Sequence, residues 1–120
     1  MATVLTIEDN PSISMVIDLA LSGEGHNVIV FNDSRKAYQN LIEGIKPDLI
    51  LVDLKMPGMN GKELVEKLRE DPQLKSIPVT IITGSITSEE TLPPEGSYQA
   101  LMQKPFDLQD LINTVDSLVA

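Results

Sequence analysis

The most informative absences in this 120-residue chain are those of cysteine and tryptophan, alongside only two tyrosines and two phenylalanines. Without cysteine the chain forms neither disulfide bonds nor thiolate metal sites, which fits a reducing compartment, and we expect a cytoplasmic protein. The chain also lacks a run of about 20 apolar residues, so we expect no membrane span. Its first residues contain no basic region and no cleavage-type site, and we therefore expect no signal peptide.

Positive charge is scarce as well, because nine Lys and Arg face 18 Asp and Glu, and the formal net charge is -9. Contacts to nucleic-acid phosphates require Lys and Arg, so we expect no direct binding of DNA or RNA. The acidity is compatible with a divalent cation or a basic protein patch as ligand, although solubility accounts for most of it. Hydrophobic residues make up 42% of the sequence, which suffices for one folded domain over residues 1–120.

Short runs rich in valine, isoleucine and leucine alternate with segments of helical periodicity. The runs predict strands over residues 3–7, 27–31, 49–52, 79–82 and 100–102. Capping residues and apolar spacing predict helices over about 11–22, 34–42, 61–70 and 108–119. The apolar face of the first helix is expected to comprise Ile13, Val16, Ile17, Ala20 and Leu21.

Alternation of strands and helices implies a parallel sheet covered on both faces, which is an α/β fold. With right-handed crossovers, five strands favour a single-domain, doubly wound (βα)5 sandwich with the flavodoxin-like sheet order 2-1-3-4-5. The weak link lies between the fourth and fifth strands, where Pro93 and Pro94 would terminate a helix. A helix in that connection should be short or irregular and begin near Thr87.

Asp53 directly follows the most hydrophobic short run of the chain. Packing explains such a residue poorly, because buried aspartate is almost always paired or bound to a metal. Glu8 and Asp9 follow the first strand, Thr83 closes the fourth, and Lys104 follows the fifth. Because the carboxyl ends of parallel strands lie along one edge of a sheet, we expect these side chains to converge.

This set of side chains is suited to accepting a phosphoryl group. Three neighbouring carboxylates repel one another unless a cation lies among them, and hard oxygen ligands suit Mg²⁺. With the ammonium of Lys104 as a second cation, Asp53 becomes a nucleophile and Thr83 a hydrogen-bond donor to the product. Taken singly, each residue has a plainer interpretation: an acidic pair complements a helix N-terminus, a threonine ends a strand, and a lysine is solvated. Their joint placement favours the site.

The same residues resemble the motifs of a known family. The matching segments, in order, are Glu8-Asp9, the run 53–61, Thr83-Gly84 and Lys104-Pro105-Phe106. Together they resemble the receiver (CheY-like) domain of two-component response regulators over nearly the whole chain. The resemblance implies that the domain takes a phosphoryl group from a sensor histidine kinase or a histidine phosphotransfer protein. It also implies that the domain catalyses its own phosphorylation and dephosphorylation and is not otherwise an enzyme.

The resemblance also implies a role for each site residue. Asp53 would be the phosphoacceptor, and Asp9, Asp53 and the backbone carbonyl of Lys55 would bind Mg²⁺, with Glu8 assisting through water. Lys104 would contact the phosphoryl group, followed by a cis peptide at Pro105.

Thr83 would be the switch hydroxyl that moves toward the phosphorylated aspartate. The sequence is compatible with an output domain or a downstream protein as partner. It is also compatible with a homodimer.

One departure from the family pattern affects the output. The family usually carries Tyr or Phe three residues before the lysine, where this chain has Leu101. The coupling in which a threonine shift turns an aromatic ring inward therefore does not operate in that form. A pseudo-receiver or phosphate sink, which binds partners without that switch, stays open as an alternative.

Two other functions fit the sequence less well. Phosphatases with an aspartyl nucleophile typically need a second aspartate two residues later, and this chain has Lys55 there. A flavin-binding module would need a phosphate-binding loop after the first strand, where the acidic pair stands instead. The side chain of Lys55 is either an ordinary exposed lysine or a residue that tunes the lifetime of the acyl phosphate. His26, the only histidine, is interpreted as a surface residue.

Overall fold

The computed structural model describes residues 2–56, 58–84 and 91–119. Within these residues, five strands form one sheet, and every neighbouring pair is parallel. They are β1 (Thr3–Ile7), β2 (Asn27–Phe31), β3 (Leu49–Val52), β4 (Val79–Thr83) and β5 (Ala100–Gln103). Their order is β2-β1-β3-β4-β5, which confirms the predicted α/β class and sheet order. The predicted strand bounds agree to within one residue.

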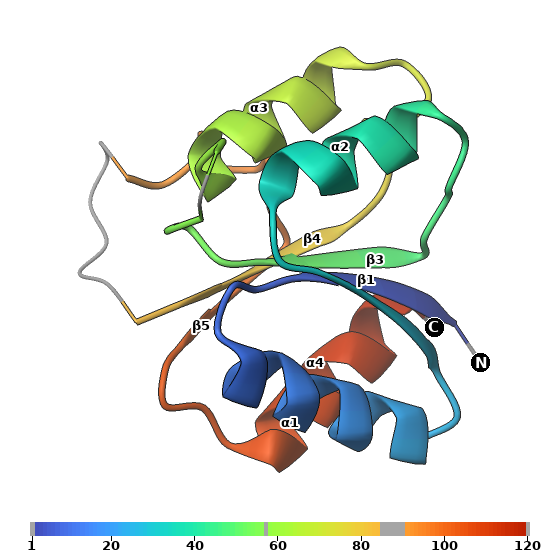
Figure 1. Cartoon of the computed structure of the whole chain (residues 1–120), viewed down its shortest axis with the longest axis vertical. Coiled ribbons are helices and arrows are strands. Elements are labelled where there is room, and N and C mark those ends of the chain that lie inside the picture. The colour runs from blue at the N-terminus through green and yellow to red at the C-terminus, as the bar shows by residue number, and fades with distance from the viewer. Residues whose placement is uncertain (1, 57, 85–90, 120) are drawn as a thin grey trace.

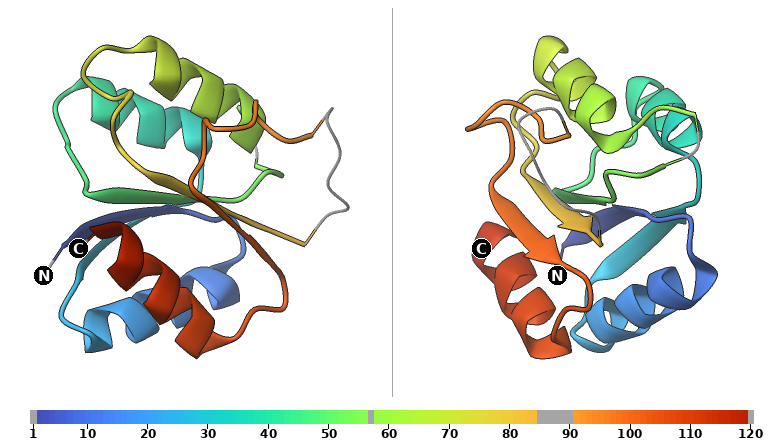
Figure 2. Two further views of the ribbon diagram at one scale, coloured as in Figure 1. Left: turned by 180° about the vertical axis from the view of Figure 1, so that it is seen from behind. Right: turned by 90° about the vertical axis from the view of Figure 1, so that its left-hand side faces the viewer.

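In the described part of the chain, four helices cover the two faces of the sheet: α1 (Pro11–Gly23), α2 (Ser34–Ile42), α3 (Gly61–Glu70) and α4 (Leu108–Val119). Figure 1 shows α2 and α3 on one face and α1 and α4 on the other, and Figure 2 shows the same three layers from two further sides. The helix expected to begin near Thr87 lies outside the described residues. Residues 91–99 contain turns and bends and no helix.

Side-chain caps fix the point at which three helices begin. Asn10, Asp33 and Asn60 accept backbone amide hydrogens in the first turns of α1, α2 and α3. Glu63 completes a capping box with Asn60, because its carboxylate accepts the amide of the cap residue. Each cap is worth about 1 kcal/mol. The caps of α1 and α3 also define where the loops after β1 and β3 end.

The central strand β3 supplies side chains to both layers of the core. Ile50 and Val52 belong to the apolar cluster under α2 and α3, whereas Leu49 and Leu51 belong to the cluster under α1 and α4. This alternation follows from the two-residue period of a strand. Burial on both faces explains why the run before Asp53 is continuously apolar.

Two residues are placed differently from their prediction. Val16 was expected on the buried face of α1 but is 42% exposed, because Ile17 and Leu21 occupy the centre of the contact with the sheet. The interpretation of His26 as a surface residue is wrong for its side chain, which is only 6% exposed. No helix in residues 2–56, 58–84 and 91–119 is long and apolar enough to cross a membrane.

The ring of His26 is buried because it precedes β2, whose first residue pairs with the first residue of β1. Its Nδ1 accepts the amide hydrogen of Ala2 at 3.2 Å, and its Nε2 lies 3.0 Å from a carboxylate oxygen of Asp116. The ring thereby joins the start of β1 to α4. Sequence periodicity gives no sign of these two partners, since they lie 24 and 90 residues away.

Candidate functional site

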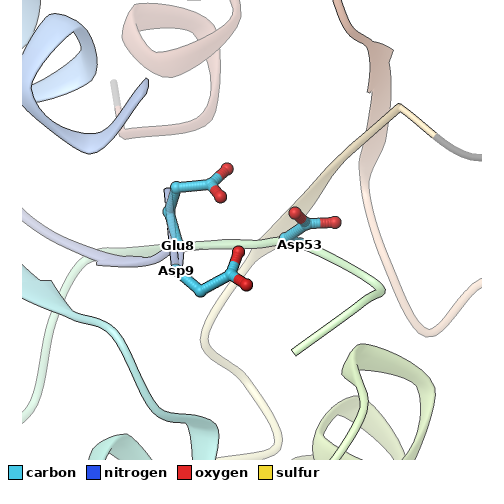
Figure 3. Close-up of side chains that lie close together, drawn as sticks. All are labelled: Glu8, Asp9 and Asp53. Carbon is cyan, nitrogen blue, oxygen red and sulfur yellow. The ribbon is translucent and has the colours of Figure 1, made fainter. Parts of the chain in front are cut away.

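Three carboxylates meet at the carboxyl edge of the sheet. One carboxylate oxygen each from Glu8, Asp9 and Asp53 lies within 4.8 Å of the other two. Figure 3 shows the side chains of Glu8 and Asp9 leaving the end of β1 toward the side on which Asp53 lies. Lys104, which follows β5, places its Nζ 2.6 Å from Glu8 Oε1 and 2.9 Å from Asp53 Oδ2. Segments almost 100 residues apart thus form one cluster.

Backbone hydrogen bonds hold these residues just beyond the strands. The amide of Asp53 donates to the carbonyl of Ile7 at 3.2 Å, and the amide of Glu8 donates to the last residue of β2 at 2.9 Å. On the other side of the site, the amide of Lys104 donates to the carbonyl of Thr83 at 2.8 Å. Glu8, Asp53 and Lys104 therefore each continue a strand pairing, so the sheet itself fixes the spacing of these three residues.

Burial and charge oppose each other in this cluster. Glu8 is 3% and Asp53 7% exposed, whereas Asp9 is exposed. Burial raises the pKa of Glu8, and its hydrogen bond to Lys104 only partly offsets this. Burial alone would lower the pKa of Lys104, but its hydrogen bonds to Glu8 and Asp53 outweigh burial and raise it. Lys104 therefore stays charged, and this one ammonium faces three carboxyl groups.

The donor set fits a divalent cation. Carboxylate oxygens are hard ligands, and Mg²⁺ is usually bound by one or two carboxylates together with water. Two carboxylates of the cluster are buried and one is open to solvent, so an ion would have both a fixed side and an accessible side. One such ion would add positive charge where three carboxyl groups face a single ammonium. Glu8, Asp9 and Asp53 are therefore residues that could hold a metal.

The loop after Asp53 folds back onto the end of β3. The amide of Lys55 donates to Asp53 Oδ1 at 3.2 Å, so the two oxygens of this carboxylate have different partners. The amide of Gly61 donates to the carbonyl of Leu54 at 2.9 Å. A Cβ at Gly61 would lie 2.6 Å from the carbonyl oxygen of Asp53, a distance that real Cβ atoms do not show. Glycine is therefore required where α3 begins.

The other predicted residues lie at the same edge. Thr83 is the last residue of β4 and is fully buried. The peptide bond between Lys104 and Pro105 is cis, as the resemblance implied. The side chain of Lys55 is exposed, and Leu101 on β5 is 39% exposed.

Sequence reasoning missed two features of the site. It did not anticipate that Lys104 pairs with Glu8 as well as with Asp53, because no local pattern encodes which carboxylate a lysine reaches. It also missed Ser34, a fully buried serine at the start of α2 whose hydroxyl bonds to Met59 in the loop after β3. A serine beside a helix cap is ordinary in sequence, so only its burial reveals the contact.

Comparison with known proteins gives one consistent family. The family model described as the response regulator receiver domain matches residues 4–116. The DNA-binding response regulator MtrA of Mycolicibacterium smegmatis is 32% identical over 113 residues, which are 93% of this chain and 48% of that protein. The chain thus spans about half the length of that relative.

Two other similar proteins match over their full length. Protein PilH of Pseudomonas aeruginosa is 30% identical over 100% of this chain and 99% of its own. Among solved structures, the chemotaxis response regulator CheY4 of Vibrio cholerae has a TM-score of 0.87 and 28% identity, with 98% of each chain covered.

Proposed function

The chain belongs to the family of response regulator receiver domains, and on this premise we propose that it accepts a phosphoryl group on Asp53 in a Mg²⁺-dependent reaction. The observation that carries the proposal is the position of Asp53, which is buried between two other carboxylates and the ammonium of Lys104. We further propose that residues 1–120 form the receiver domain. A sensor histidine kinase or a histidine phosphotransfer protein would donate the phosphoryl group.

Each residue has a defined task in the proposed reaction. Asp9, Asp53 and the backbone carbonyl of Lys55 would hold Mg²⁺, with Glu8 assisting through water. When bound, the ion supplies positive charge at the phosphoryl oxygens. Lys104 supplies a second positive charge 2.9 Å from Oδ2 of Asp53.

In the transfer, one carboxylate oxygen of Asp53 forms a bond to phosphorus while the bond from phosphorus to the donor nitrogen breaks. The amide of Lys55 and the ammonium of Lys104 each bind a different oxygen of Asp53 and so fix the rotation of its carboxylate. The product is an acyl phosphate, whose oxygens Lys104 and the hydroxyl of Thr83 would bind. The chain thus supplies nucleophile and positioning, and the partner supplies the phosphoryl group.

Leu101 favours a second candidate function. It replaces the aromatic residue of the family's usual switch and lies partly exposed on β5. A pseudo-receiver or phosphate sink would bind partners without that switch, and its partners would not depend on a ring turning inward. The output would then go to a further domain, a separate downstream protein or a second copy of the chain.

Intact mass spectrometry tests the proposed reaction. The wild type is incubated with Mg²⁺ and acetyl phosphate, in parallel with Asp53→Asn and with Asp48→Asn as a matched control at the other end of the sheet. We expect one added phosphoryl group on the wild type and on Asp48→Asn, none on Asp53→Asn, and none in the presence of a chelator. An unmodified wild type that is folded and binds Mg²⁺ would favour the pseudo-receiver, and a modified Asp53→Asn would contradict the assignment of the acceptor.

A further inference from the structure

Ser34 makes an unusual contact for a residue in the first turn of a helix. It is fully buried, and its hydroxyl donates to the carbonyl oxygen of Met59, 25 residues later. The hydroxyl oxygen of Ser34 also accepts the amide hydrogen of Met59 at 3.1 Å. One side chain of α2 therefore satisfies both backbone groups of a residue in the loop between β3 and α3.

The neighbouring residue of α2 packs against the same loop. Gly58 has a positive φ of 85°, and a Cβ there would lie 3.2 Å from the side chain of Arg35. Met59 is itself 7% exposed and belongs to the apolar cluster under α2 and α3. The far side of the loop is thus held against α2 by a buried hydroxyl and by the apolar side chain of Met59.

The near side of the loop carries the proposed chemistry. The amide of Lys55 bonds to Asp53, and Gly61 closes the loop on the carbonyl of Leu54. The loop is therefore fixed at its two ends by β3 and α3, and at Met59 by Ser34. A shift of the loop away from Asp53 would break two buried hydrogen bonds at Ser34, and a buried amide without a partner is costly.

We propose that Ser34 is a positioning residue for the metal site, because its hydroxyl fixes the loop that contains the backbone carbonyl of Lys55. The inference rests on the proposed function, which assigns that carbonyl to Mg²⁺. Ser34 touches neither ion nor phosphoryl group and acts through Met59. Residues that orient metal ligands typically change metal affinity by about 10- to 100-fold when they are lost.

The test compares Ser34→Ala with Ala37→Gly. Ala37 is also fully buried in α2, so its replacement by glycine weakens the same helix and leaves the hydroxyl in place. Three quantities are measured: the dissociation constant for Mg²⁺ by calorimetry, the hydrogen exchange of the Met59 amide, and the rate of phosphorylation by acetyl phosphate at limiting and saturating Mg²⁺.

For Ser34→Ala we expect Mg²⁺ affinity to fall about tenfold and the Met59 amide to exchange faster. Phosphorylation should slow at limiting Mg²⁺ and recover at saturating Mg²⁺. For Ala37→Gly we expect wild-type Mg²⁺ affinity despite its lower stability. If Ser34→Ala does not fold, Ser34→Cys, which keeps only a weak donor and acceptor, replaces it with the same expected direction.

Equal Mg²⁺ affinity in the wild type and in Ser34→Ala would overturn the inference while leaving the proposed function intact. An equal loss in Ser34→Ala and Ala37→Gly would also overturn it, because general loosening of α2 would then be the cause. A folded wild type that neither binds Mg²⁺ nor takes up a phosphoryl group would overturn both proposals.

Discussion

At the amino end of the sheet, carboxylates have individual partners, whereas at the carboxyl end they crowd together. Asp48, just before β3, accepts the amide hydrogen of Thr3 at 2.8 Å, and Asp116 pairs with His26 at 3.0 Å. These contacts join neighbouring elements, and each carboxylate meets a donor. They serve the fold, because each fastens β1 or β2 to the rest of the chain.

At the carboxyl end, Glu8 and Asp53 share the ammonium of Lys104, and the carboxylate of Asp9 lies close to both of theirs. Two of these carboxylates are buried, so their repulsion is weakly screened by solvent. A fold gains little from such an arrangement, whereas binding of a cation and transfer of a phosphoryl group both depend on it. Both ends of the sheet carry polar side chains. The site differs from the scaffold because its carboxyl groups outnumber their partners.

The largest expected difference between the two ends of the sheet is in their effect on Mg²⁺ affinity. We expect Asp9→Asn to lower the affinity by at least about tenfold, because it removes one of three negative oxygen ligands. Asp48→Asn removes the same charge at the other end of the sheet and should leave the affinity unchanged. Calorimetric titration measures both. A similar loss in both variants would mean that overall charge governs binding.

The next effect is on stability in the presence of a chelator. His26→Ala should lower the free energy of unfolding by about 1 kcal/mol, since it removes two hydrogen bonds of a buried ring. Asp9→Asn should raise it slightly, because it relieves repulsion among the carboxylates. Urea denaturation gives both values. Destabilisation by Asp9→Asn would show that the carboxylate of Asp9 has stabilising partners, as the carboxylates at the amino end do, and would contradict the expected repulsion.

A pH dependence should distinguish Glu8 from exposed glutamates. Because burial raises its pKa above the ordinary 4.5, the folded state binds this proton more tightly than the unfolded state does. The associated stability is present below about pH 4.5 and is lost as pH rises through the folded-state pKa.

In the absence of divalent ions, we therefore expect the free energy of unfolding of the wild type to fall relative to that of Glu8→Gln as pH rises from about 4.5 through the folded-state pKa. Glu24→Gln is the control, because Glu24 is exposed at the amino end. If the difference in the free energy of unfolding between the wild type and Glu8→Gln does not change over this pH range, the pKa of Glu8 is not raised by folding.

The smallest expected effect concerns the exposed side chain of Lys55. If it borders the path of hydrolytic water, Lys55→Ala should change the rate of acyl phosphate hydrolysis by about threefold, which corresponds to about 0.65 kcal/mol in the barrier. Loss of the phosphoryl mass over time measures this rate. Identical rates in the two proteins would leave Lys55 an ordinary surface lysine.

The sequence predicted the scaffold well because local patterns encode it. The apolar run before Asp53 predicts a strand buried on both faces, and the alternation of strands and helices predicts the sheet order. That order alone places Glu8, Asp53 and Lys104 at one edge. The predicted assignment of roles to these residues came from the family resemblance and remains a proposal.

The contacts of single side chains were not predictable in the same way. The ring of His26 is buried by partners at both ends of the chain, and Ser34 bonds to Met59, 25 residues later. Arg69 on α3 donates to the carbonyls of Ser97 and Ile77, which lie 28 and 8 residues later in the chain. Such pairings depend on the tertiary arrangement, which periodicity and capping do not specify.

The most direct test of the contrast between the two ends is to locate a bound divalent cation. Mn²⁺ added in small amounts broadens the amide signals of nearby residues in a two-dimensional NMR spectrum of the labelled protein. We expect broadening at Asp9, Asp53 and Lys55, removed by excess Mg²⁺, and none at His26 or Asp48. Broadening at both ends of the sheet, or none at the carboxyl end, would contradict the account.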